Sequence, residues 1–309
     1  MAGEEQSVKC RSLGRTGMEV SVVGVGTWQL GGEWGRAYTS AEAEAIFDAA
    51  RDAGVTLIDT AECYGDHLSE RLVGQAIRRD RERWVVATKF GHRFNRHLER
   101  TEHWSADEVK LQLDDSLRAL GTDHVELYQF HSGGNAVFDN AALWEMLARE
   151  KERGRVRHLG ISISGDAAQQ QYQAARAFAV GAEVIQVVYN RLNRAPEDRV
   201  LPICHDQELG VLARVPLASG FLSGKYSQGA SFGPEDVRAS RTAEERERLI
   251  AEAQRIRAHE APAGLSLSAW ALAWCLGHRV VSAVIPGCKS PEQVRANAQA
   301  AEIDLPARP

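Results

Sequence analysis

Strand-like and helix-like stretches alternate along this chain of 309 residues from one end to the other. Short apolar runs that are typical of buried parallel strands recur eight times, and an amphipathic stretch follows each of them. Eight such units predict an α/β fold, a closed (β/α)8 TIM barrel that forms one domain over residues 1–309. The predicted strands cover residues 20–25, 56–59, 84–89, 124–130, 156–162, 183–189, 210–216 and 280–286.

Residues that cap helices stand at the start of most of the amphipathic stretches. A doubly wound sheet is disfavoured, because Gly24-Val25-Gly26 is followed by Thr27-Trp28 and no GxGxxG motif opens a helix there. The helices are expected to begin near Ser40, Ser69, Ser105, Asp139, Asp166, Ala195, Thr242 with Ser266, and Ser290.

Three segments stand outside the regular pattern. Residues 13–17, with the sequence LGRTG, predict a hairpin turn that caps the bottom of the barrel. Residues 90–105 and 227–239 are too long for plain connections, and residues 241–260 predict an extra, heavily charged helix. Long loops after barrel strands commonly shape a substrate mouth, so both insertions are expected at the carboxyl-terminal face.

The overall charge excludes two classes of partner. There are 37 Lys and Arg against 42 Asp and Glu, a net charge of −5, which gives neither a basic field for nucleic acid nor a polybasic membrane anchor. The acidic N-terminus has no hydrophobic signal region, and the longest apolar stretch, residues 265–277, is too short to cross a bilayer. Five scattered cysteines without CxxC indicate reduced thiols in a cytoplasmic protein.

Three histidines lie close together in the first insertion, at positions 92, 97 and 103. No cysteine or carboxylate completes a convincing zinc spacing around them, so we expect surface histidines and no metal site. Three tryptophans that follow strand ends are candidates for an apolar substrate pocket or for plain packing: Trp28, Trp34 and Trp104.

Four polar side chains stand at or just after the ends of predicted strands two, three and four: Asp59, Tyr64, Lys89 and His131. Each alone would be as readily a packing, capping or solvated residue. A phenol has a pKa of about 10, and a neighbouring ammonium lowers it; two pKa units need roughly 2.7 kcal/mol. Lys89 can supply that charge, Asp59 can hold Lys89, and His131 can bind a substrate oxygen. The set predicts a site that gives a proton to an oxygen or takes one from it.

An ordered set of motifs extends this pattern over nearly the whole chain, from about residue 13 to residue 301. The set resembles the aldo-keto reductase superfamily, in particular bacterial NADP-dependent members. The matching segments are VVGVGTW at 22–28, LIDTAECYG at 57–65, ATK at 87–89, LYQFH at 127–131, VYN at 188–190, PLASGFLSGK at 216–225 and IPGCKSPEQV at 285–294.

The resemblance implies hydride transfer between NADPH and a small-molecule carbonyl, with Tyr64 as general acid and the family's four catalytic residues at Asp59, Tyr64, Lys89 and His131. The cofactor would lie extended across the barrel mouth. The implied cofactor-binding residues are Gly26, Thr27, Trp28, Asp59, Ser162, Gln186, Arg214, Leu217, Ser219, Gly220, Lys225, Gly287, Lys289, Gln293 and Asn297.

The resemblance also assigns these residues to parts of the cofactor. Ser162 and Gln186 would bind the nicotinamide carboxamide, and the loop of residues 217–225 would lie along the pyrophosphate. The segment of residues 287–297 would hold the adenosine. Lys289 within it suits the 2′-phosphate, since a cation there favours NADP over NAD.

Two positions depart from the common family pattern. Ile163 follows Ser162 where an asparagine is usual, so one amide contact to the carboxamide is expected to be lost. Arg214 stands where many members have an aromatic residue that stacks on the nicotinamide. Its planar guanidinium can contact the cofactor instead, and a branch of bacterial members carries a similar Arg-Val-Pro-Leu-Ala-Ser-Gly segment.

Two other functions stay open from the sequence. A lysine at a barrel strand end can form a Schiff base, so a barrel lyase or aldolase with Lys89 as nucleophile is one alternative. A non-catalytic NADPH-binding subunit that senses redox state is the other. The physiological substrate, the preferred reaction direction and the oligomeric state cannot be derived from these residues.

Overall fold

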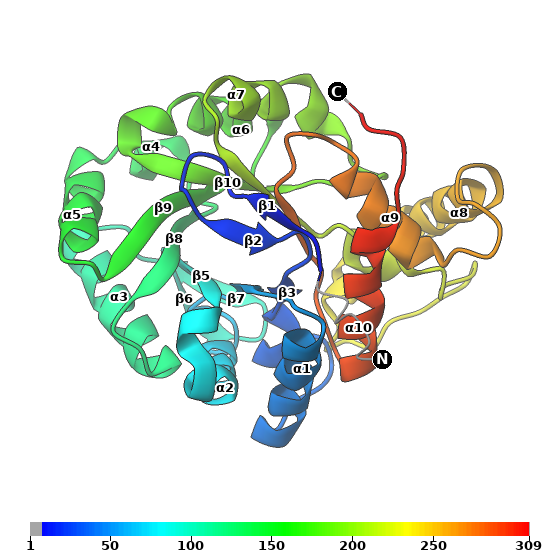
Figure 1. Cartoon of the computed structure of the whole chain (residues 1–309), viewed down its shortest axis with the longest axis horizontal. Coiled ribbons are helices and arrows are strands. Elements are labelled where there is room, and N and C mark those ends of the chain that lie inside the picture. The colour runs from blue at the N-terminus through cyan, green and yellow to red at the C-terminus, as the bar shows by residue number, and fades with distance from the viewer. Residues whose placement is uncertain (1–7, 309) are drawn as a thin grey trace, which may run out of the picture.

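Residues 8–308 are described by the computed structural model, and their centre is a barrel of eight parallel strands (Figure 1). The strands pair around the barrel in chain order, and bridges from Val23 to Val284 and from Gly26 to Gly287 join the first to the last. This confirms the predicted (β/α)8 TIM barrel. The strands are β3 (Val25–Gly26), β4 (Leu57–Asp59), β5 (Val85–Phe90), β8 (Val125–His131), β9 (Val156–Ser162), β10 (Ala182–Val188), β11 (Gly210–Arg214) and β12 (Ala283–Ile285).

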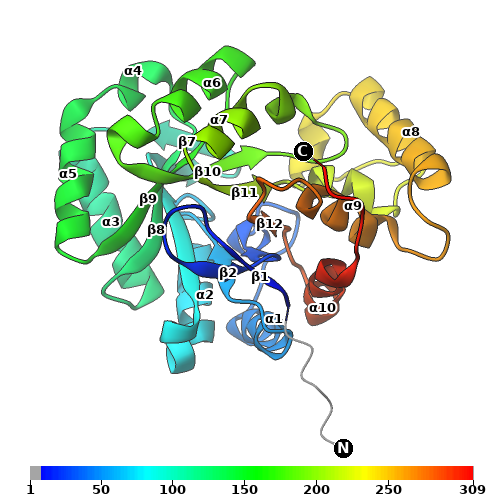
Figure 2. The same ribbon diagram turned by 45° about the horizontal axis from the view of Figure 1, so that its top comes forward.

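Helices surround the barrel on the outside (Figure 2). Their apolar faces pack against the outer side of the strands and form the larger of two hydrophobic clusters. The main helices are α1 (Ser40–Asp52), α2 (Leu68–Ile77), α3 (Ala106–Leu120), α5 (Ala141–Glu152), α6 (Ala167–Ala175), α7 (Val200–Asp206), α9 (Leu267–Leu276) and α10 (Pro291–Gln299), with α4 (Asn135–Phe138) and α8 (Ala243–His259) in addition. The predicted extra charged helix is α8.

Most of the expected helix starts carry the expected cap. Ser105 and Thr242 form capping boxes at α3 and α8, and at α1 the capping box belongs to Thr39, one residue before the predicted Ser40. The start near Ser69 was predicted for the wrong reason. His67 precedes α2 in a left-handed conformation, and the buried Ser69 hydroxyl bonds instead to the Thr27 hydroxyl at 2.7 Å. Tertiary packing thus uses Ser69 to join α2 to the loop after β3.

The prediction for the first strand, residues 20–25, was wrong in its extent. The structure splits this run between two sheets. Its first part belongs to β2 (Glu19–Ser21), which pairs antiparallel with β1 (Cys10–Ser12), and only β3 (Val25–Gly26) enters the barrel. A continuous apolar run cannot reveal this division, because both parts are buried.

The hairpin of β1 and β2 closes the bottom of the barrel, as predicted from the turn at residues 13–17. Leu13 and Val20 are fully buried and pack with inward-facing residues such as Leu57, Leu127 and Leu212. Figure 1 shows the hairpin lying across the near end of the barrel. The barrel interior is therefore a packed plug at this end, which leaves the opposite end for a site.

The two insertions meet at that opposite end. The first contains a hairpin that the sequence pattern did not reveal, of β6 (His92–Arg96) and β7 (Glu99–Glu102). In the second, Asp236 forms a backbone bridge with Trp34, which follows a short 3-10 helix, η1 (Trp28–Gly31). His97 also lies 4.0 Å from Glu235. Together, these segments cover one side of the carboxyl-terminal face of the barrel.

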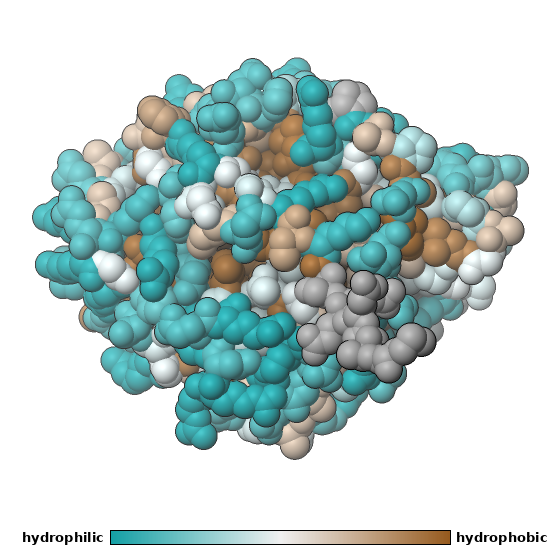
Figure 3. Space-filling model, viewed as in Figure 1, coloured by the Kyte–Doolittle hydropathy of each residue, from teal (hydrophilic) through white to brown (hydrophobic). Residues whose placement is uncertain are grey.

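The face that carries the N-terminal hairpin is largely hydrophilic, with apolar residues in separate patches (Figure 3). Among residues 8–308, no helix has the length and hydropathy needed to cross a membrane. The acidic N-terminus, from which the absence of a signal peptide was predicted, lies outside the described residues.

Candidate active site

The four predicted catalytic side chains come together at the carboxyl end of neighbouring strands. Asp59 ends β4, Lys89 lies one residue before the end of β5, and His131 ends β8. Tyr64 lies in the turn between β4 and α2. Because β4, β5 and β8 pair in register as parallel neighbours, their carboxyl ends converge on one point of the barrel rim.

Lys89 is the centre of this group. Its ammonium Nζ donates to Asp59 Oδ2 at 2.9 Å, to the Thr60 carbonyl at 2.6 Å and to the Tyr64 hydroxyl at 3.3 Å. The side chain is fully buried, which opposes the charge, but the nearby Asp59 carboxylate and Tyr64 raise its pKa above the ordinary value. Lys89 therefore carries a fixed positive charge beside the phenol.

The protonation of Tyr64 differs from the expectation. Burial raises the pKa of the phenol to about 12, and Lys89, although it acts in the predicted downward direction, does not outweigh it. The low dielectric of the site penalises the phenolate more than one ammonium at 3.3 Å stabilises it. Tyr64 thus keeps its proton at neutral pH, the state required of an acid. Its ring stacks on Trp28, with centroids 6.0 Å apart.

His131 faces the Tyr64 ring, with ring centroids 6.3 Å apart at 82°. Burial lowers its pKa far below the ordinary value, and the positive charge of Lys89 adds to the effect. The imidazole is therefore neutral. Its Nδ1 lies 3.8 Å from the Cys63 thiol, whose pKa burial raises to about 12. A neutral imidazole and a protonated phenol can both hydrogen-bond a carbonyl oxygen.

Asp59 is held on its other side by the barrel wall. Its Oδ1 accepts a hydrogen bond from Gln186 Nε2 at 2.6 Å, and Gln129 Nε2 lies 3.4 Å away. Ser162 donates in turn to Gln186 Oε1 at 3.2 Å. Gln186 lines the cavity above the strands, whereas Ser162 is buried and does not. Direct contact of Ser162 with a carboxamide stays a prediction.

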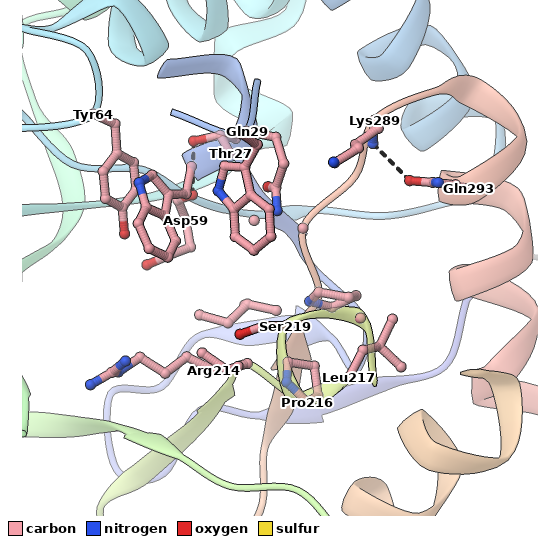
Figure 4. A pocket seen from close by; sticks show the side chains of 18 of the residues that line it. Thr27, Gln29, Asp59, Tyr64, Arg214, Pro216, Leu217, Ser219, Lys289 and Gln293 are labelled. Carbon is pink, nitrogen blue, oxygen red and sulfur yellow. Dashed lines mark hydrogen bonds between the residues drawn. The ribbon is translucent and has the colours of Figure 1, made fainter. Parts of the chain in front are cut away.

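A cavity of about 800 Å³ opens from this group across the carboxyl-terminal face. In Figure 4, Thr27, Asp59 and Tyr64 lie on one side of it, and Arg214 with the loop of Pro216 lies opposite. The predicted cofactor residues that line it are Gly26, Thr27, Trp28, Asp59, Gln186, Arg214, Leu217, Ser219, Gly220, Lys225, Gly287, Lys289, Gln293 and Asn297.

The cavity has the features needed for an extended dinucleotide. Four buried polar atoms at its wall have no hydrogen-bond partner within residues 8–308: Gln29 Oε1, Trp34 Nε1, His92 Nδ1 and Arg214 Nε. Buried polar groups normally have partners, so these atoms are positioned for a polar ligand. Gly220 has a φ of 92°, and its backbone borders the cavity without a side chain. The residues present therefore fit a nicotinamide dinucleotide.

Cations gather at the far end of the cavity. Burial lowers the pKa of Lys289, and the nearby charges of Arg238 and Lys225 lower it further, against an opposing effect of Asp236. The Lys289 amide donates to Gln293 Oε1 at 2.9 Å, near the start of α10 (Figure 4). Clustered cations that lower one another's pKa are stabilised by a bound anion, so this end suits a phosphate group.

The two departures from the family pattern contact each other. Arg214 Nη2 donates to the backbone carbonyl of Ile163 at 3.1 Å. Burial lowers the pKa of Arg214, whereas the nearby Tyr64 and Asp59 act in the opposite direction. The guanidinium thus lies beside the catalytic group, at the place where the sequence pattern predicts contact with the cofactor.

Comparison with known proteins shows the family of the chain. The model of the aldo/keto reductase family matches residues 22–308. The chain belongs to this family. Its membership makes the protein an oxidoreductase that acts on small carbonyl compounds and uses a nicotinamide cofactor.

Two curated relatives and one solved structure show how close other reductases of the family are. The aldo-keto reductase YhdN of Bacillus subtilis is 34% identical over 232 residues, which is 74% of this chain and 67% of that protein. The NADH-specific methylglyoxal reductase of Escherichia coli is 30% identical, covering 95% of this chain and 93% of its own. The holo form of aldo-keto reductase AKR11C1 from Bacillus halodurans has a TM-score of 0.80 and 29% identity, covering 97% and 92%.

Several residues of this reductase site were not found from the sequence. Gln29, Arg100 and Arg238 line the cavity, and Glu33 lies behind Arg100. None of the four lies at the end of a barrel strand, so the strand-end rule does not apply to them. A charged residue within an insertion at the barrel mouth was the available signal for the two arginines.

The histidines of the first insertion also separate. His92 lines the cavity beside His131, with ring centroids 5.3 Å apart, while His103 bonds to Glu108. Within residues 8–308, no group of three or more His, Cys, Asp or Glu side chains is placed to hold a metal ion. Of the three tryptophans, Trp28 and Trp34 line the cavity, and Trp104 packs on Phe130.

Proposed function

We propose that this aldo/keto reductase reduces an aldehyde or ketone to an alcohol with NADPH, and that Tyr64 is the general acid. The observation that carries the proposal is the Tyr64 hydroxyl, 3.3 Å from the Lys89 ammonium at the wall of a cavity that fits a dinucleotide. A buried phenol that keeps its proton, next to a fixed cation, is suited to protonate a developing alkoxide.

The residues divide the work in the following way. Bound NADPH supplies a hydride to the carbonyl carbon. Tyr64 hydrogen-bonds the carbonyl oxygen and gives it the hydroxyl proton. His131, as a neutral imidazole, donates a second hydrogen bond to the same oxygen. Lys89 stabilises the phenolate that remains, and Asp59 fixes the position and charge of Lys89. Both donors are in place before charge develops, so little reorganisation is needed.

The preference for NADPH rests on the cationic end of the cavity. Lys289 would bind the 2′-phosphate, and Gln293 and Asn297 would lie beside the adenosine. The relative from Escherichia coli is NADH-specific by name, so the family alone does not decide the cofactor. Affinity measured for both cofactors will separate the two possibilities.

A Schiff-base mechanism is disfavoured by the state of Lys89. A Schiff base needs a neutral, accessible amine, whereas this ammonium is fully buried, donates three hydrogen bonds and has a raised pKa. Borohydride trapping of a carbonyl compound on Lys89 would reverse this conclusion.

The test follows NADPH oxidation over a panel of aldehydes and ketones, with Tyr64→Phe as the matched variant. The Tyr64 hydroxyl makes one hydrogen bond among residues 8–308, so the variant is expected to fold and to bind NADPH as the parent does. Turnover should fall by about 10²–10⁴-fold, the usual contribution of a general acid. Equal turnover in both proteins would exclude Tyr64 as the acid. Tight NADPH binding with no turnover of any carbonyl would favour a redox-sensing subunit.

A further inference from the structure

The end of the cavity beside Tyr64 contains an arginine that is already paired with a carboxylate of the protein. The cavity wall around Tyr64 includes Arg100, which comes from β7. Its charge reaches the catalytic group: beside the larger effect of burial, it acts to lower the pKa of both Cys63 and His131. An arginine at this place would ordinarily bind the carboxylate of an acidic substrate.

Glu33, which lies outside the cavity, forms an ion pair with Arg100 and so competes with a substrate carboxylate for it. Arg100 Nη2 donates to Glu33 Oε1 at 2.6 Å and also contacts Oε2, so one nitrogen bridges both carboxylate oxygens. Arg100 Nη1 donates to the Glu99 carbonyl at 2.9 Å. Glu33 is 2% exposed and does not line the cavity, so a substrate has no access to it. Both terminal nitrogens of Arg100 are thus used by the protein.

Glu33 also orders the wall that Arg100 belongs to. It accepts hydrogen bonds from the Trp28 indole at 2.9 Å and from the Leu98 amide at 2.9 Å. Trp28 stacks on Tyr64, and Leu98 lies in the turn of the β6–β7 hairpin. One buried carboxylate therefore joins the loop after β3 to the insertion after β5, with four hydrogen bonds to its two oxygens.

We propose that Glu33 is a positioning residue that sets substrate charge preference: by holding Arg100, it makes the site select uncharged aldehydes and ketones over carbonyl compounds that carry a carboxylate. Glu102, also on this wall, adds a second negative charge against an acidic substrate. Arg214 lies across the cavity at the end of β11, where its Nη2 donates to the Ile163 carbonyl. The inference rests on the proposed carbonyl reductase function.

The test compares two aldehydes that differ in one charge and one methyl group, 4-formylbenzoate and its methyl ester, at saturating NADPH. The parent enzyme should have the higher kcat/KM for the ester. In Glu33→Gln, the side chain keeps its shape but loses its charge, so Arg100 is released to a substrate carboxylate. The acid-to-ester ratio of kcat/KM should rise by about tenfold or more, the worth of one charge-assisted hydrogen bond.

The gain should lie in KM for the acid, with kcat little changed, since the new contact forms equally in ground and transition states. The double variant Glu33→Gln with Arg100→Gln should return the ratio to the parent value. A ratio that stays at the parent value in a folded, NADPH-binding Glu33→Gln would overturn the proposal. A rise that persists in the double variant would also overturn it, because the effect would not pass through Arg100.

A second variant keeps the idea testable if Glu33→Gln does not fold. Arg100→Gln leaves Glu33 without its cation, so the acid-to-ester ratio should fall below that of the parent. A rise in this variant would contradict the proposal. Failure of the parent to reduce either aldehyde, or any carbonyl of the wider panel, would instead count against the proposed function.

Discussion

The replacement Lys89→Met tests the buried ion pair that organises the site. Lys89 is fully buried, and its ammonium lies 2.9 Å from the carboxylate of Asp59, which is itself 5% exposed. At an effective dielectric constant of about 20, this separation corresponds to an attraction of roughly 6 kcal/mol. Desolvation offsets much of it, so the pair adds little net stability. Removal of one partner, however, leaves an uncompensated buried charge and should cost about 3–5 kcal/mol of the free energy of unfolding.

The assay is denaturant unfolding followed by tryptophan fluorescence, with Asp59→Asn and the double variant measured beside Lys89→Met. The double variant buries no unpaired charge, because both charges are removed. The amide oxygen that Asp59→Asn introduces would still accept from Gln186 at the position of Asp59 Oδ1. We expect the double variant to lose about 2 kcal/mol less than the sum of the two single losses. Losses that add within about 0.5 kcal/mol would show that the two charges do not interact, and the reasoning would fail.

Three further predictions follow from individual contacts. Because burial holds the pKa of Tyr64 at about 12, its acid form dominates at neutral pH, so alcohol oxidation, which needs the phenolate, should accelerate about tenfold per pH unit while carbonyl reduction stays level. A pH–rate profile that falls for oxidation would contradict this. Lys289→Met should raise KM for NADPH by about tenfold or more and leave KM for NADH unchanged; equal loss for both would place the phosphate elsewhere. Gly74→Ala puts a Cβ 2.2 Å from the Leu120 carbonyl, so the midpoint of thermal unfolding should fall by an amount equivalent to about 1–3 kcal/mol, and an unchanged midpoint would refute the close contact of α2 and α3.

The barrel and the convergence of its strand-end residues could be predicted because both follow from periodic rules. Strand ends in a parallel barrel converge, so Asp59, Lys89 and His131 were placed together by their positions at the ends of apolar runs. Helix caps such as Ser105 were found for a similar reason, since the capping box is a local pattern. These features depend on neighbouring residues in the chain and on one global count of eight strands.

The remaining features depend on contacts between distant segments. The Glu33–Arg100 pair joins residues 67 positions apart, and the Trp34–Asp236 bridge joins two loops. No spacing rule connects such positions. The expected fall in the pKa of Tyr64 was wrong because it considered the charge of Lys89 alone. That charge can be read from the sequence, whereas the extent of burial, which decides the direction of the pKa shift, cannot.

The order of proton affinities supports the proposal that Tyr64, rather than His131 or Lys89, is the acid. His131 is neutral because burial and Lys89 lower its pKa, so it has no acidic proton to give at neutral pH. Lys89 holds its proton more tightly than usual, and its donors already contact Asp59, Thr60 and Tyr64. Tyr64 lines the cavity, and its hydroxyl contacts this cation. As the substrate oxygen gains negative charge, proton transfer from Tyr64 places a phenolate next to Lys89, so the ion pair is worth most in the transition state, where catalysis requires it.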